Sequence, residues 1–121
     1  MSKLILAIED QDDNMQILRD LLTSAGYEIV EAENGEQALT AVAKRQPDLI
    51  LMDIQIPIID GYEATRRIKA DPALESIPII AVTSHAIAGG EEKARAAGCD
   101  DFVAKPYSPR QLLAKIRQYL S

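Results

Sequence analysis

Residues 48–53 read DLILMD, an apolar run that ends in the carboxylate of Asp53. A continuous apolar run of this kind is typical of a strand that is buried on both faces of a parallel sheet. In open parallel sheets, ligands bind in the crevice outside the carboxyl ends of the strands. Asp53 is therefore expected at a position where a parallel sheet carries its chemistry.

A second apolar run, residues 3–8, is followed directly by Glu9 and Asp10. Since the carboxyl ends of parallel strands meet at one edge of a sheet, the carboxylates of Glu9, Asp10 and Asp53 are expected to converge. Three anions this close together cannot all stay ionised without a cation. Oxygen ligands suit a hard divalent ion, so the sequence predicts a Mg2+ site at this edge.

Strand-like and helix-like patterns alternate five times along the chain. The expected strands span residues 4–8, 27–32, 48–53, 77–82 and 101–104. One expected helix ends at Gly26, and a second follows the cap Asn34. Two more span residues 61–70 and 91–97, and the last begins after the cap Ser108. This alternation predicts an α/β fold with a parallel sheet, right-handed crossovers and helices on both faces.

The helix expected at residues 91–97 differs from the others, because its apolar residues are nearly all alanine and Gly89 and Gly90 precede it. Alanine buries little apolar area, and glycine disfavours helix. We expect this helix to be the softest element of the fold and a candidate for movement.

Length and composition narrow the functional classes. The 121 residues fit one domain, residues 1–121, and 47% of them are hydrophobic, enough for a core. The net charge of −6 argues against direct binding of nucleic acid. A lone cysteine, Cys99, excludes an intramolecular disulfide and suits a cytoplasmic protein. No apolar stretch approaches the roughly 20 residues that span a bilayer, so neither membrane insertion nor a signal peptide is expected.

Several motifs follow the expected strands in order: IED at 8–10, MDIQIP at 52–57, DG at 60–61, VTS at 82–84 and FVAKP at 102–106. With these motifs the chain resembles the response-regulator receiver domain of two-component and phosphorelay signalling, in its stand-alone form. The resemblance covers essentially the whole chain. It implies a flavodoxin-like, doubly wound sheet of five parallel strands in the order 2-1-3-4-5.

Asp53 is expected to be the phosphoacceptor, since a carboxylate can attack phosphorus and form an acyl phosphate. Attack by one anion on another needs charge neutralisation, which a metal bound by Asp10 and Asp53, with Glu9 acting through water, would provide. The resemblance implies Mg2+ or Mn2+ as the metal, the backbone carbonyl of Gln55 as a further ligand, and no organic cofactor.

Other positions would contact or sense the phosphoryl group. Lys105 supplies a second cation and Thr83 a hydroxyl donor, and Ser84 is a further expected contact. The resemblance implies a switch in which Thr83 moves toward the phosphoryl group and Phe102 rotates inward. It also implies a cis peptide bond between Lys105 and Pro106.

Two loop positions are candidates for tuning the lifetime of the phosphoryl group. Gln55 and His85 lie two residues beyond Asp53 and Thr83, and the resemblance places such positions along the path of the hydrolytic water. His85 is also read as an ordinary solvated loop residue. Asp12 and Asp13, in contrast, are read as helix-start residues with no part in the site.

The resemblance implies a regulator and not an enzyme, with only self-catalysed phosphoryl transfer and slow autodephosphorylation. The expected phosphodonor is a histidine kinase or a histidine phosphotransfer protein. A downstream target protein would read the fourth helix, fifth strand and last helix, and the chain would act as a monomer or weak dimer.

Four alternatives stay open at this stage. A metal-dependent phosphohydrolase of the haloacid-dehalogenase type would need a second carboxylate where Gln55 stands. A flavodoxin-like cofactor binder would place a phosphate on the acidic loop at residues 9–14, which should repel it. The chain could also be a receiver excised from a longer regulator, or a degenerate receiver that takes no phosphate.

Overall fold

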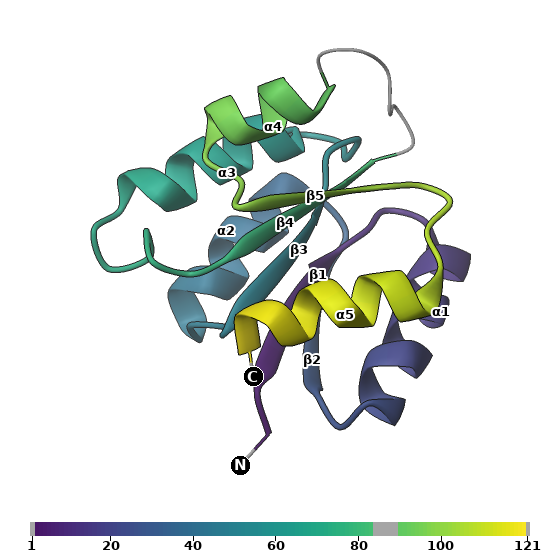
Figure 1. The fold of residues 1–121 in the computed structure, drawn as a ribbon. Coiled ribbons are helices and arrows are strands. Elements are labelled where there is room, and N and C mark those ends of the chain that lie inside the picture. Colours follow the sequence, from purple (N-terminus) through teal and green to yellow (C-terminus); the bar gives the residue numbers. More distant parts are fainter. Residues whose placement is uncertain (1, 84–89, 121) are drawn as a thin grey trace.

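The computed structural model describes residues 2–83 and 90–120, and these residues form strands and helices in strict alternation (Figure 1). The strands are β1 (Leu4–Ile8), β2 (Glu28–Ala32), β3 (Leu49–Asp53), β4 (Ile79–Thr83) and β5 (Asp101–Ala104). The helices are α1 (Asp12–Ser24), α2 (Gly35–Lys44), α3 (Gly61–Ala70), α4 (Gly90–Ala97) and α5 (Pro109–Leu120).

The strands form one parallel sheet in the order β2-β1-β3-β4-β5, which confirms the predicted fold class. The register pairs Ile8 with Met52, and Asp53 with Val82, so the carboxyl ends of β1, β3 and β4 lie at one edge of the sheet. Every residue of β1, β3 and β4 is buried, as continuous apolar strands require.

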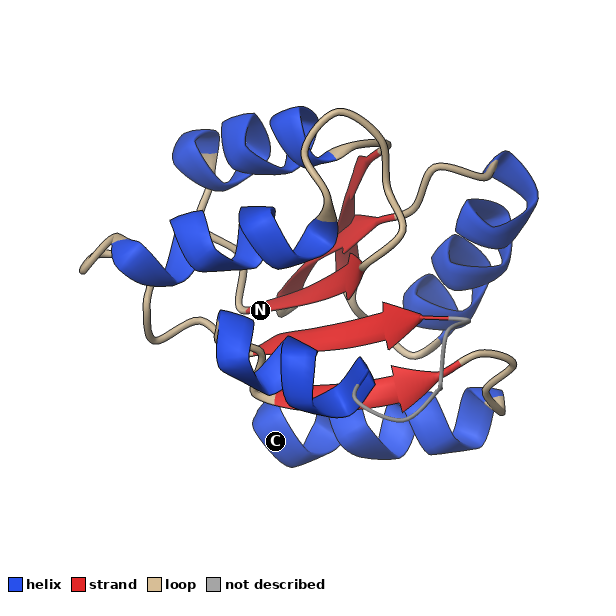
Figure 2. Ribbon diagram, turned by 90° about the horizontal axis from the view of Figure 1, so that it is seen from above, coloured by secondary structure: helices blue, strands red, loops and turns tan. Residues whose placement is uncertain are grey.

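Helices cover both faces of the sheet, as Figure 2 shows. One core lies under α1 and α5 and is built around Leu18, Leu22 and Leu112. The other lies under α2, α3 and α4, with Val42 and Ile68 among its members. The outer strand β2 is only partly buried, as the sequence pattern of an edge strand predicts.

The expected helix caps are present. The Asn34 side chain accepts a hydrogen bond from the backbone N–H of Gln37 at 2.8 Å, and the Ser108 hydroxyl accepts one from Gln111 at 3.0 Å. Gly26 follows α1 with φ +93°, in the left-handed region that favours glycine. These contacts satisfy backbone groups that a helix end leaves without partners.

The predicted boundaries of four elements need small corrections. β2 begins one residue later than predicted and α4 one residue earlier. β3 begins at Leu49, because the Asp48 carboxylate lies outside the strand and accepts the backbone N–H of Leu4 at 2.7 Å. β4 begins at Ile79 because Pro78 has no N–H to donate to the ladder, and it extends to Thr83.

The buried face of α4 consists of Gly90, Ala94 and Ala97, as its sequence predicts. Its softness stays a prediction. Within the described ranges, no helix combines the length and the apolar character that crossing a membrane requires.

The loop after β3 packs closely against the start of α2. A Cβ atom on Gly35 would overlap the carbonyl oxygen of Ile59 and come within 2.7 Å of the Ile59 Cβ. Gly35→Ala is therefore expected to lower the free energy of unfolding by about 2 kcal/mol, the range found for overpacked sites. Chemical denaturation measures this change. Thr40→Ala, at an exposed position of the same helix, is the matched control, and equal stabilities of the two variants would contradict the close packing.

Candidate functional site

Four elements deliver polar side chains to one edge of the sheet. Glu9 and Asp10 follow β1, Asp53 is the last residue of β3, Thr83 is the last residue of β4, and Lys105 follows β5. These residues are far apart in sequence, and the parallel register brings their strand ends to the same edge. The convergence predicted from the strand ends is therefore present.

The carboxylates of Glu9, Asp10 and Asp53 form a compact cluster. Each offers an oxygen, and the three oxygens lie within 4.8 Å of one another. Glu9 and Asp53 are buried, with 3% and 5% of their surface exposed, whereas Asp10 is exposed. An all-oxygen donor set that opens to solvent on one side fits Mg2+, which keeps several waters when proteins bind it.

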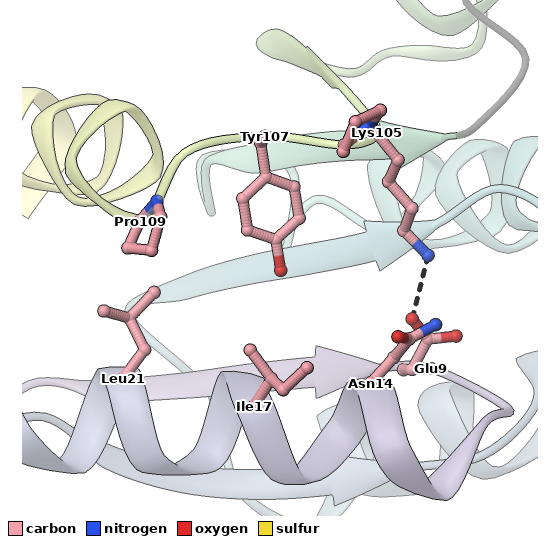
Figure 3. A pocket seen from close by; sticks show the side chains of 8 residues that line it. Glu9, Asn14, Ile17, Leu21, Lys105, Tyr107 and Pro109 are labelled. Atoms are coloured by element: carbon pink, nitrogen blue, oxygen red, sulfur yellow. Dashed lines mark hydrogen bonds and ion pairs between the residues drawn. The ribbon is translucent and has the colours of Figure 1, made fainter.

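The ammonium of Lys105 bridges two of these carboxylates. Its Nζ lies 2.8 Å from Glu9 Oε1 and 3.1 Å from Asp53 Oδ2, and Figure 3 shows the side chain reaching toward Glu9. Burial lowers the pKa of Lys105, but the hydrogen bond to Glu9 and the charges of Asp53 and Glu9 outweigh it and raise that pKa above its usual value. Lys105 therefore stays protonated and offsets part of the cluster's negative charge.

The burial and crowding of these carboxylates shift the pKa of Glu9. Burial raises the pKa of Glu9, and its contact with the Asp53 carboxylate raises it further, while Lys105 acts in the opposite direction. The net shift is upward, so one lysine does not fully compensate the buried anions. A divalent cation would supply the missing positive charge.

The loop after β3 fixes the orientation of the Asp53 carboxylate. The backbone N–H of Gln55 donates to Asp53 Oδ1 at 3.0 Å, while Lys105 contacts Oδ2. A Cβ atom on Gly61 would lie 2.7 Å from the backbone oxygen of Asp53, so the start of α3 packs against the strand end. Gln55 itself is exposed.

The candidate switch residues lie on adjacent strands. Thr83 is buried, with 1% of its surface exposed. Phe102 on β5 is half-buried and packs against the core beneath α2, α3 and α4.

The Lys105–Pro106 peptide bond is cis, as the resemblance implies. Two further candidates, Ser84 and His85, lie outside the described residues.

Asp12 and Asp13 lie in the first turn of α1, where acidic side chains stabilise the helix N-terminus. The structure therefore supports their reading as helix-start residues.

Sequence reasoning missed a groove of about 350 Å³ beside the carboxylate cluster (Figure 3). Its lining comes from the end of β1, from α1, and from the segment that leads from β5 into α5: Glu9, Asn14, Ile17, Leu21, Lys105, Pro106, Tyr107 and Pro109. Ile17 is 57% exposed although it is large and apolar. Ile17 falls outside the helical stripe of Met15, Leu18 and Leu22 that faces the core, so the sequence marks it as a surface residue but does not reveal the groove.

Known proteins share this sequence pattern and fold. A family model described as the response regulator receiver domain matches residues 5–117. The polar-differentiation response regulator DivK of Brucella anthropi is 42% identical over 120 residues, which cover 99% of this chain and 98% of that protein.

Two solved structures superpose closely. A putative response regulator from Chloroflexus aurantiacus has a TM-score of 0.95 at 31% identity, with 99% of this chain and 98% of that one covered. The receiver domain of sensor histidine kinase PA1611 from Pseudomonas aeruginosa has a TM-score of 0.93 at 34% identity and the same coverage. That receiver was solved with a magnesium ion coordinated in its active-site cleft.

The raised pKa of Glu9 predicts a stability effect with a defined sign. When the pKa of a carboxyl is higher in the folded state than its ordinary 4.5, the folded protein loses stability as the pH rises from that ordinary value through the pKa of the folded state. In metal-free buffer at neutral pH, Glu9→Gln is therefore expected to raise the melting temperature, and the gain should shrink as the pH falls toward 4.5.

Mg2+ affinity should fall at the same time, by about tenfold. Thermal melts across pH with a chelator, and Mg2+ titrations, measure the two effects. Glu36→Gln, at an exposed position of α2, is the control. A Glu9→Gln protein that is less stable than the parent at neutral pH without metal would contradict the crowding of the cluster.

Proposed function

The chain belongs to the response-regulator receiver family of two-component signalling, and from this premise we propose that Asp53 accepts a phosphoryl group from a phosphohistidine on a partner protein. The observation that carries the proposal is the geometry around Asp53. Its buried carboxylate ends a central strand, is oriented by the N–H of Gln55, and contacts the ammonium of Lys105 at 3.1 Å.

The transfer exchanges one bond to phosphorus for another. A carboxylate oxygen of Asp53 attacks the phosphorus, a P–O bond forms, and the P–N bond to the partner's imidazole breaks. The electron pair of that bond returns to the imidazole nitrogen. Lys105 contributes a positive charge beside the attacking carboxylate, which lowers the repulsion between the two anions.

Members of the receiver family bind Mg2+ at the acidic site. In this chain, we propose that Asp10 and Asp53 bind the ion directly, that Glu9 acts through water and that the Gln55 carbonyl completes the set. When bound, Mg2+ neutralises charge on the phosphoryl oxygens. Mn2+, also a hard cation, is expected to substitute.

The phosphoryl group would be held and sensed by residues of β4 and β5. Thr83 supplies a hydroxyl and Lys105 an ammonium, with Ser84 as a further contact. Movement of Thr83 toward the phosphoryl group would open space for Phe102, which is half-buried on β5. Because Phe102 has no hydroxyl, its inward state would depend on packing alone. Gln55 and His85 are proposed to tune the phosphoryl lifetime.

Receiver domains interact with histidine kinases and with downstream targets. We propose that residues 1–121 act as one receiver domain in the cytoplasm, take the group from a histidine kinase or histidine phosphotransfer protein, and present α4, β5 and α5 to a target. The chain would be a regulator whose only chemistry is phosphoryl uptake and slow autodephosphorylation. In the hydrolase alternative a second carboxylate would stand at position 55, where this chain has Gln55.

The phosphoacceptor assignment is tested by intact-mass spectrometry after incubation with acetyl phosphate. The parent protein is expected to gain one phosphoryl group with Mg2+ and none with a chelator, since the anionic site repels the donor without metal. Asp53→Asn should take up none. Phosphoryl uptake by Asp53→Asn at the rate of the parent protein would contradict the assignment. Asp60→Asn, in the same loop, is the matched control and should behave like the parent.

Lys105→Ala separates metal binding from signalling. Mg2+ affinity should stay equal or increase, because the lysine competes with the metal for Glu9 and Asp53. Coupling between the phosphoryl group and the surface of α4, β5 and α5 should be lost, since no ammonium remains to draw that group toward β5. Nuclear magnetic resonance shifts of the α4, β5 and α5 amides on adding beryllofluoride, a phosphoryl mimic, report it. Lys44→Ala, at an exposed position, is the control. If beryllofluoride shifts the amides of Lys105→Ala as much as those of Lys44→Ala, Lys105 has no coupling role.

A further inference from the structure

Lys69, near the end of α3, uses all three donor positions of its ammonium. Its Nζ lies 2.9 Å from the backbone oxygen of Glu75, 2.8 Å from that of Ile77 and 2.9 Å from Asp100 Oδ2. The side chain is only 17% exposed, so water competes little for these bonds. Since an ammonium has three N–H donors, Lys69 is saturated by contacts to two segments outside α3.

Asp100 is the residue that this lysine holds, and it lies in the turn between α4 and β5. Its Oδ2 also accepts the backbone N–H of Ile79 at 2.8 Å, and its own N–H donates to the Ile79 carbonyl at 2.8 Å. Its carbonyl accepts the Tyr119 hydroxyl at 3.1 Å and an Arg95 N–H at 3.3 Å. The turn after α4 is thus fastened to β4 and α5 as well as to α3.

Close packing supports this attachment. Gly98, which follows α4, has φ +115°, and a Cβ atom there would lie 2.8 Å from Lys69 Cγ. The Lys69 stem therefore reaches beneath the turn only because residue 98 has no side chain. On the same side, Thr65 Oγ1 lies 3.7 Å from Cys99 Sγ. The end of α4 and the last turns of α3 form one tightly joined unit.

The rest of α4 is held differently. Its buried residues are Gly90, Ala94 and Ala97, which bury little apolar area, and the ion pair between Arg95 and Glu91 joins two residues of the helix itself. In a βαβ unit the helix runs back across the sheet, so α4 begins at the edge that carries Asp53 and ends at the opposite edge. Directed polar bonds thus fasten the end of α4 that is farther from the site.

We propose that the Lys69–Asp100 pair is the pivot of α4, and that Lys69 is a positioning residue for the signalling surface. This inference rests on the proposed function, because it specifies how phosphorylation of Asp53 reaches that surface. In the phosphorylated state α4 turns about its fastened C-terminal end. Its displacement is therefore largest in its first turn and smallest at Gly98.

Two spin-label distances test the pivot. Both are measured from a label on Thr40→Cys in α2, one to Glu92→Cys in the first turn of α4 and the other to Ala96→Cys in its last turn. All three positions are exposed, whereas the Cys99 thiol is buried and burial raises its pKa, so the reagent reacts at the introduced cysteines. With Mg2+ and beryllofluoride, the 40–92 distance should shift by about 2 Å while the 40–96 distance holds.

Lys69→Met tests the clamp itself in the unmodified protein. The 40–96 distance distribution should broaden without any phosphoryl mimic, and beryllofluoride should then shift it as it shifts the 40–92 distance. Asp100→Asn keeps an acceptor oxygen but removes the charge, and it should give the same result in weaker form, which also provides a test if Lys69→Met folds poorly. Arg67→Met, which removes an exposed ion pair of the same helix, should leave both distances as in the parent.

Equal shifts of both distances in the parent protein would overturn the pivot. An unchanged 40–96 distribution in Lys69→Met and Asp100→Asn would overturn the clamp. Binding of beryllofluoride, read from the melting temperature, without a shift of the 40–92 distance would also reject the pivot. Absence of binding would instead contradict the phosphoacceptor function, while the resting distributions would still decide the clamp.

Discussion

The ammonium of Lys105 lies between two buried carboxylates, and the functional edge of the sheet depends on this contact. Without a cation between them, the carboxylates of Glu9 and Asp53 would face each other in a buried setting, and burial and the contact with Asp53 raise the pKa of Glu9 even with the lysine present. The site is therefore electrostatically incomplete. The carboxylate cluster suits a divalent ion, and under the proposed function that ion and Lys105 would both contact the phosphoryl group.

The fold serves to hold this contact. Lys105 and Glu9 are separated by 96 residues, and Lys105 and Asp53 by 52. A parallel sheet joins such distant residues because each crossover returns the chain to the same edge. The strands β1, β3 and β4 that form that edge are buried throughout, whereas α4 packs through glycine and alanine, and polar bonds hold the turn that follows it. Buried strands that carry the site and a helix with little apolar packing are thus neighbours in one small domain.

Much of this arrangement could be predicted from the sequence. Continuous apolar runs identified the central strands, and the carboxylates that follow them predicted the cluster of Glu9, Asp10 and Asp53, because a buried strand and its end leave a pattern in the sequence. The Lys69–Asp100 pair and the groove around Tyr107 could not be predicted in this way. They depend on how a loop and two helices pack in three dimensions, and a single lysine on a helix surface carries no signal of its partners. The boundary error at β4 arose because Pro78 sits in an apolar run but has no N–H to donate to the ladder, although its carbonyl accepts the N–H of Ile50.

A crystal structure of the protein with Mg2+ and beryllofluoride would show directly whether the carboxylate cluster and Lys105 are arranged around a phosphoryl group. We expect beryllium bonded to a carboxylate oxygen of Asp53, Mg2+ held by Asp10 and Asp53, and the Lys105 ammonium in contact with a fluorine atom. Beryllofluoride bound elsewhere, or a metal that avoids the carboxylate cluster, would contradict the claim that these charges are arranged to accept a phosphoryl group.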